Sequence, residues 1–168
     1  MSRIAAVQKI ALIVLVSAAL ALPALAGTHK VPSENPFATI AIPDEWKTDA
    51  IEGGIEATSE DGEVYLAIEE TDSDSIKECV AEAVKYLKGK GVTVTESSMT
   101  QEEGKLGEMD LVDISWDGKD EDGPAKIGLS IVAVTKTKGL LVIYWASPAG
   151  EKKHAPALEA VTKSITKA

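Results

Sequence analysis

The sequence is poor in the residues on which most catalytic sites depend. Its 168 residues include one cysteine, Cys79, and two histidines, His29 and His154. A lone cysteine excludes an intramolecular disulfide, so stability must come from packing. The sequence also lacks a Gly-x-Ser-x-Gly elbow and the glycine-rich loops that bind phosphates. We therefore predict a protein that is not an enzyme and needs no cofactor. A hydrolase is a less favoured hypothesis than a binding protein or a carrier of a small ligand or metal.

Basic and aromatic residues are also scarce. The chain has 17 Lys and Arg against 27 Asp and Glu, which gives a net charge of −10. This balance disfavours binding to nucleic acid or to an anionic membrane surface. Only seven residues are Phe, Trp or Tyr, too few to favour the sugar-stacking cleft of a glycosidase.

Twelve of the acidic residues lie between Asp44 and Asp74, where Lys47 is the only base. Such a stretch is typical of a solvated, self-repelling face. The alternative is a docking surface for a cationic partner. The candidate residues for that surface are Asp44, Glu45, Trp46, Glu69, Glu70, Asp72 and Asp74.

The first 26 residues have the organisation of a secretory signal peptide. Arg3 and Lys9 precede an uncharged apolar run over residues 10–22, and Pro23 is followed by Ala24-Leu25-Ala26. The apolar run is too short for a membrane-spanning helix, and the small residues suit signal peptidase. We expect an exported protein, periplasmic or extracellular, with no membrane anchor after cleavage and a net charge of −12 once the two bases are removed.

Cleavage after Ala26 would expose the sequence Gly27-Thr28-His29. A free amine, two backbone amides and an imidazole at the third position form a square-planar set of four nitrogens, which suits Cu(II) or Ni(II). The sequence predicts metal binding there in vitro, provided that the cut falls at this bond. Residues 27–36 are polar and contain two prolines, so we expect a disordered lead-in.

Hydrophobic periodicity over residues 37–168 predicts one α+β domain. Residues 75–88 repeat apolar side chains at helical spacing, with a Ser75 capping box and Gly89 at the end. Residues 155–166 predict a second helix with Pro156 in its first turn. Strands are expected at 37–42, 51–58 with a bulge at Gly53-Gly54, 63–69, 93–101, 110–116, 126–134 and 140–145.

Because these strands come in runs, we expect a largely antiparallel sheet of six to seven strands flanked by the two helices, an α/β/α sandwich. Residues 140–145 are apolar on both faces, as expected of a central strand. The acidic loop 117–123 lacks calcium-ligand spacing and is predicted to be a hairpin turn. Trp116 and Trp145 are predicted to be core residues, whereas Trp46 either packs against the sheet or lines a ligand groove.

The segment Ile40-Ala41-Ile42-Pro43-Asp44-Glu45-Trp46 resembles the strand-Pro-x-x-Trp opening of the PsbP-like superfamily, which includes DcrB-like lipoproteins and Ran-binding MOG proteins. The order of elements over residues 37–166 and the ending at Ser164-Ile165 are also similar. The resemblance implies an α/β/α sandwich without an active site. It also implies an accessory or binding role, here with an envelope protein as partner. A small-ligand or Cu/Ni carrier is the alternative hypothesis.

Overall fold

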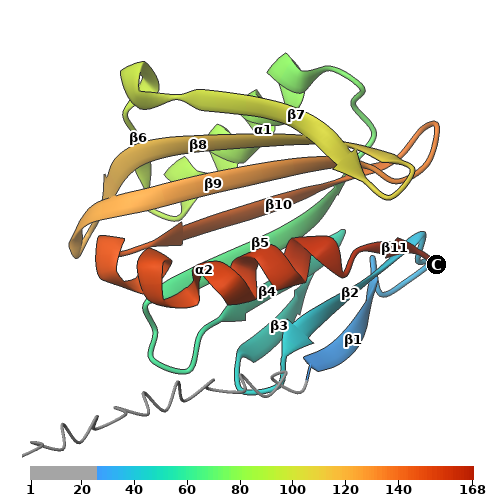
Figure 1. The fold of residues 1–168 in the computed structure, drawn as a ribbon, viewed down its shortest axis with the longest axis horizontal. Coiled ribbons are helices and arrows are strands. Elements are labelled where there is room, and N and C mark those ends of the chain that lie inside the picture. The colour runs from blue at the N-terminus through green and yellow to red at the C-terminus, as the bar shows by residue number, and fades with distance from the viewer. Residues whose placement is uncertain (1–25) are drawn as a thin grey trace, which may run out of the picture.

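The computed structural model describes residues 26–168. The predicted signal peptide falls on residues 1–25, which lie outside the described part, and on Ala26. Residues 26–168 form two α-helices and two antiparallel sheets (Figure 1). Among residues 26–168, no helix is both long enough and apolar enough to cross a membrane.

The main sheet has eight strands, and every pair in it is antiparallel. β6 (Thr93–Val94) and β7 (Thr100–Leu106) both pair with β8 along the outer edge. Counted from the opposite edge, the strand order toward β6 and β7 is β3 (Lys47–Ile51), β4 (Gly54–Thr58), β5 (Val64–Thr71), β10 (Gly139–Ala146), β9 (Gly123–Ala133) and β8 (Met109–Asp120).

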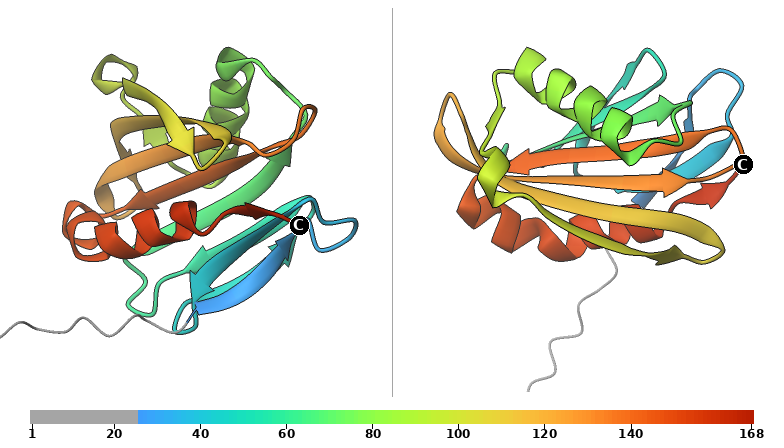
Figure 2. Two further views of the ribbon diagram at one scale, coloured as in Figure 1. Left: turned by 45° about the vertical axis from the view of Figure 1, so that its right-hand side comes forward. Right: turned by 90° about the horizontal axis from the view of Figure 1, so that it is seen from above.

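Helices α1 (Ile76–Gly89) and α2 (Pro148–Lys163) lie on opposite faces of this sheet, as the right-hand view of Figure 2 shows. Each helix covers its own hydrophobic cluster. On β10, Leu140 and Val142 belong to the α2 cluster, while Leu141 and Ile143 belong to the α1 cluster. The predicted α/β/α sandwich with a doubly covered central strand is therefore confirmed, although the sheet has eight strands instead of the expected six to seven.

A second, three-stranded sheet lies beside α2. It consists of β1 (Ala26–Val31), β2 (Ala38–Pro43) and β11 (Thr166–Lys167). The prediction of a disordered lead-in is wrong for residues 27–31, which pair with β2 and bury Val31 completely. Both prolines of that segment lie in the loop after β1, where they do not interrupt the hydrogen-bond ladder.

Three local predictions need correction. Glu52 and Gly53 form a two-residue turn between β3 and β4 instead of a bulge, and Gly54 is the first residue of β4. Gly53 has a φ of 72°, which favours glycine. Residues 93–101 form a short strand, a 3₁₀ turn (Glu96–Ser98) and the start of β7. Helix α2 begins at Pro148, capped by the Ser147 hydroxyl, so Pro156 lies inside the helix.

The first helix follows its prediction closely. The Ser75 side chain accepts a hydrogen bond from the Glu78 amide, and Gly89 is the last helical residue. Cys79, Ala83 and Leu87 form its buried stripe. Trp46, Trp116 and Trp145 are 5%, 3% and 8% exposed, so all three tryptophans are core residues.

Candidate functional site

Three aromatic rings meet where β5, β10 and the C-terminal half of α1 come together. Tyr65 and Trp145 are direct partners across the β5–β10 ladder, and their rings stack 5.2 Å apart at an interplanar angle of 12°. The ring of Tyr86, from α1, lies 6.4 Å from that of Trp145. Tyr65 is 38% exposed and is one of two large hydrophobic side chains exposed among residues 26–168, the other being Met99.

The strand and helix patterns explain these positions. Val64 and Leu66 point into the α2 cluster, so Tyr65 between them points to the opposite face, beneath α1. On α1, Tyr86 immediately precedes the buried Leu87 and is half-buried on the flank of the helix. The aromatic set is thus held by rigid elements at the boundary between core and solvent.

A charged pair borders the rings. The Tyr86 hydroxyl donates a hydrogen bond to Glu56 Oε1 at 2.6 Å, and Lys90 Nζ lies 2.5 Å from the same oxygen. The Lys90 ammonium also lies 5.4 Å from the centroid of the Tyr86 ring. Burial opposes ionisation of Glu56, but the hydrogen bonds from Lys90 and Tyr86 overcome it and hold the Glu56 pKa below its usual range. Burial and the Glu56 carboxylate raise the pKa of Tyr86.

These groups line a cavity of about 310 Å³, closed on one side by the β8–β9 hairpin. The prediction of a hairpin at loop 117–123 is confirmed, and Asp120 Oδ1 accepts hydrogen bonds from the amides of Asp122 and Gly123 in its turn. We call this cavity the aromatic pocket. Its charged lining residues are one base and four acids, namely Lys90, Glu56, Asp120, Glu121 and Asp122.

A wider, more open groove of about 670 Å³ continues from the pocket between β5 and α1, sharing Tyr86 and Lys90 with it. We call it the acidic groove. Partial burial raises the pKa of Glu69 within it, and the negative charges of Glu56 and Glu82 raise it further. The charged lining of the groove consists of Glu69, Glu70, Asp72, Glu82, Lys85 and Lys90.

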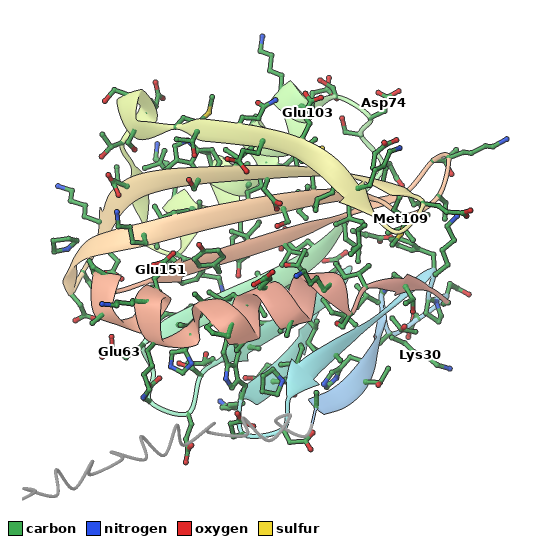
Figure 3. The ribbon with its side chains drawn as sticks, in the orientation of Figure 1. Lys30, Glu63, Asp74, Glu103, Met109 and Glu151 are labelled. Atoms are coloured by element: carbon green, nitrogen blue, oxygen red, sulfur yellow. The ribbon has the colours of Figure 1, made fainter. Side chains whose placement is uncertain are left out.

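The structure divides the predicted partner surface in two. Glu69, Glu70 and Asp72 line the acidic groove, and Asp74 lies just beyond it in the loop before α1. Asp44, Glu45 and Trp46 lie in the β2–β3 turn at the other end of β5. Figure 3 marks these two ends by Asp74 and Glu63, and the eight residues of β5 separate them by roughly 25 Å.

Trp46 packs edge-on against the His154 ring, with centroids 5.7 Å apart, so it occupies the core position that the packing alternative predicted. His154 Nε2 lies 2.9 Å from an Asp61 oxygen. The Ser59 hydroxyl donates to the same carboxylate. Because the serine is bonded to the acid rather than to the imidazole, this arrangement is not that of a Ser-His-Asp triad.

The remaining sequence candidates lie apart from the aromatic pocket. Cys79 is 1% exposed, as predicted from its place on the apolar helix face, and burial raises the pKa of its thiol. Gly27, Thr28 and His29 pair with residues of β2. Within residues 26–168, no three His, Cys, Asp or Glu side chains are grouped closely enough to hold a metal ion.

Comparison with solved structures identifies the fold. Cyanobacterial PsbP (CyanoP) from Synechocystis sp. PCC 6803 matches with a TM-score of 0.59 at 9% identity, covering 92% of this chain and 99% of its own. LpqN of Mycobacterium tuberculosis, described as involved in cell envelope biogenesis, matches with a TM-score of 0.51 at 13% identity, covering 84% and 91%. A Mog1 mutant matches with a TM-score of 0.50 at 10% identity, covering 83% and 95%.

A Bacteroides thetaiotaomicron structure also matches, with a TM-score of 0.53 at 15% identity over 79% of this chain, which spans only 45% of that structure's length. No protein-family model matches the sequence, and no curated protein matches it either. The protein is thus an α+β sandwich with the PsbP-like fold. The resemblance noted in the sequence is confirmed as a similarity of fold.

Sequence reasoning missed the aromatic pocket. The alternation of side chains in β5 places Tyr65 on the sheet face opposite Val64, and this pattern could have been used to identify Tyr65 as a candidate. The meeting of Tyr65 with Trp145 depends on the register between strands 80 positions apart, and no local pattern encodes that register.

Proposed function

We propose that this protein is an exported, non-catalytic accessory protein of the cell envelope that binds another protein through the aromatic pocket and the acidic groove. The observation that carries the proposal is the partly exposed Tyr65 ring, stacked on Trp145 and bordered by charged groups. Protein interfaces are enriched in Tyr and Trp anchors seated in pockets with polar rims. A role in the envelope agrees with the predicted signal peptide and with the description of LpqN, which shares the fold.

The geometry supports binding better than catalysis. In the aromatic pocket, Tyr86 and Lys90 both bond to the Glu56 carboxylate, so these three groups are engaged with one another. A general acid or base needs a free proton-transfer path to a substrate. A stacked pair such as Tyr65 and Trp145, in contrast, offers a flat surface that loses little conformational entropy on contact.

Site-specific photocrosslinking in the source cells would test this function. A photoreactive residue replacing Tyr65 should yield a discrete adduct with one envelope protein. The same residue at Met99, the other exposed large hydrophobic position, is the matched control and should not yield that adduct. Identical adduct patterns at the two positions, or none at Tyr65, would refute a docking surface at the pocket.

A second cavity gives the small-ligand alternative a specific observation. It has a volume of about 520 Å³ and lies between the start of α1 and strands β8 to β10. Its apolar floor includes Ile76, Cys79, Val112 and Ile131, and its rim includes three Asp and two Lys side chains. A carrier should show a rise in Tm with short-chain fatty acids that Ile131→Trp, which fills the cavity, abolishes. An unchanged Tm in the wild type would remove this candidate.

A further inference from the structure

We propose that the group recognised by the aromatic pocket is an arginine side chain of the partner, stacked on Tyr65 and paired with the carboxylates of the β8–β9 hairpin. This inference rests on the proposed docking function and specifies its chemistry. It follows from three properties of the pocket, which are its charge, an internal cation–π contact and the shape of its aromatic surface.

The first property is uncompensated negative charge. Glu56 is neutralised by Lys90. Asp120, Glu121 and Asp122 take part in none of the salt bridges found in residues 26–168. An apolar partner segment would remove water from these carboxylates without replacing the hydrogen bonds that the water makes, which is unfavourable in free energy. A cationic side chain would restore those bonds, so charge complementarity selects a basic segment.

The second property is that the pocket already holds one cation of its own chain. Lys90 lies over the Tyr86 ring while its ammonium contacts Glu56. This is the combination of ring face and carboxylate that binds cations in proteins. Tyr65 and the hairpin carboxylates line the same cavity, and the Lys90 ammonium is bonded to Glu56 rather than to them.

The third property is planarity. The Tyr65 ring is backed by the nearly parallel indole of Trp145, which holds it as a flat platform. A guanidinium is planar, stacks on such a ring and can bond a carboxylate through two N–H groups. A lysine ammonium is compact and strongly hydrated, so it uses neither feature fully. The pocket should therefore favour arginine over lysine.

The acidic groove extends this preference along the partner chain. Its charged lining has four carboxylates against two ammonium groups. Burial raises the pKa of Glu69, and the negative charges of Glu56 and Glu82 raise it further. An added cation in the groove would offset that repulsion. A segment with a second basic residue a few positions from the arginine would follow the groove between β5 and α1.

Fluorescence anisotropy with the mature protein at about 0.15 M salt would test the inference, because exposed charge attraction is screened there. The probes are labelled peptides of the form Gly-Ser-X-Gly-Ser-X, in which X is arginine, lysine or citrulline. Citrulline keeps the shape of arginine without its charge. We expect the arginine peptide to bind at least about fivefold more tightly than the lysine peptide, and the citrulline peptide not to bind detectably.

Variants locate the site. Tyr65→Ala should weaken arginine binding about tenfold, Tyr65→Phe should preserve it, and Met99→Ala is the matched control that should leave it unchanged. The double variant Glu121→Gln/Asp122→Asn should also weaken binding and keeps the Asp120 turn intact. Circular dichroism and Tm confirm that each variant is folded.

Equal binding of the arginine and lysine peptides, or no effect of Tyr65→Ala, would overturn the inference and indicate nonspecific attraction to an acidic protein. This failure is distinguishable from failure of the proposed function. If photocrosslinking at Tyr65 still captures one envelope protein, only the assignment of arginine as the recognised group is refuted. If neither experiment succeeds, the docking site itself is refuted.

Discussion

His154 on α2 and Asp61 in the β4–β5 turn form a close pair, with Nε2 3.0 and 2.9 Å from the two carboxylate oxygens. Lys153 contacts the same carboxylate at 2.7 Å, and the Ser59 hydroxyl donates to it at 2.7 Å. The pair joins the N-terminal half of α2 to a turn that is more than 90 residues earlier in the chain. Trp46 packs against the same imidazole, so the β2–β3 turn, the β4–β5 turn and α2 meet at this point.

This pair predicts a specific pH dependence of stability. The Lys153, Ser59 and His154 contacts hold the Asp61 pKa well below its usual range. The stabilisation is therefore present above the ordinary carboxyl pKa of about 4 and is lost as pH falls through the lower pKa of the folded state. Asp61→Asn should lower the Tm by a few degrees at pH 7 and reduce the loss of stability between about pH 4 and pH 2.

Thermal melts across that pH range provide the measurement. Asp49→Asn is the matched control, because its ion pair with Lys47 is largely exposed and should contribute little. If Asp61→Asn and wild type lose stability in parallel as the pH falls, Asp61 is not the group responsible.

A second prediction concerns Gly128, which faces Tyr144 across the β9–β10 ladder. A Cβ atom at Gly128 would lie 2.0 Å from Tyr144 Cε1, so the ring occupies the space that any larger residue would need. Gly128→Ala should reduce the free energy of unfolding by about 1–3 kcal/mol, the usual range for overpacking.

Urea unfolding measures this change. Gly104→Ala is the control, because Gly104 is also in a strand, has an ordinary φ and has open space around its Cβ position. It should be nearly neutral. Equal effects of the two substitutions would show that loss of glycine flexibility, rather than contact with Tyr144, governs the outcome.

The elements that follow from the sequence are those whose signals are local. The stripe of Cys79, Ala83 and Leu87 repeats at helical spacing within one segment, and short connections specify the β8–β9–β10 meander. The start of α2 was missed because residues 148–154 include no large apolar side chain that could mark a helical stripe. Their helical structure depends on the Ser147 cap and on docking of Gly150 against Glu63. Strand β1 was missed because its ladder partner, rather than its own composition, makes it a strand.

The candidate site depends on contacts that are distant in sequence. Glu56 meets Lys90 and Tyr86 only because β4 and the end of α1 are brought to one side of β5. The acidic stretch from Asp44 to Asp74 predicted a single surface. An eight-residue strand runs through that stretch, however, and places its two ends on opposite sides of the molecule.

The third prediction concerns copper binding at Gly27-Thr28-His29. In an antiparallel ladder, successive residues direct their amides alternately toward and away from the partner strand, so one of the Thr28 and His29 amides faces β2. Square-planar coordination uses both amides and must therefore detach β1. Mature protein should bind Cu(II) at least about tenfold more weakly than the free Gly-Thr-His peptide, if detachment costs about 1.4 kcal/mol or more.

Isothermal titration of both species gives the comparison, with N-terminal sequencing to establish that the chain begins at Gly27. His29→Ala should abolish binding. Affinity equal to that of the free peptide would show that the pairing with β2 does not oppose coordination, and undiminished binding by His29→Ala would place the metal elsewhere.

The fourth prediction tests the electrostatics of the acidic groove directly. Burial and the nearby negative charges of Glu56 and Glu82 raise the pKa of Glu69, so the folded state holds the Glu69 proton more tightly than the unfolded chain does. Ionisation of Glu69 thus opposes folding once the pH rises through the raised pKa, and this penalty persists at pH 7. Glu69→Gln should raise the Tm at pH 7 by roughly 1–3 °C and have no such effect at pH 4, where the native side chain is largely protonated.

Glu102→Gln on the exposed strand β7 is the matched control and should show no pH-dependent gain. A Glu69→Gln gain of equal size at both pH values would mean that packing, rather than charge, causes it. An arginine peptide seated in the groove should produce a similar gain in wild type, because an added cation removes the same repulsion that the glutamine removes.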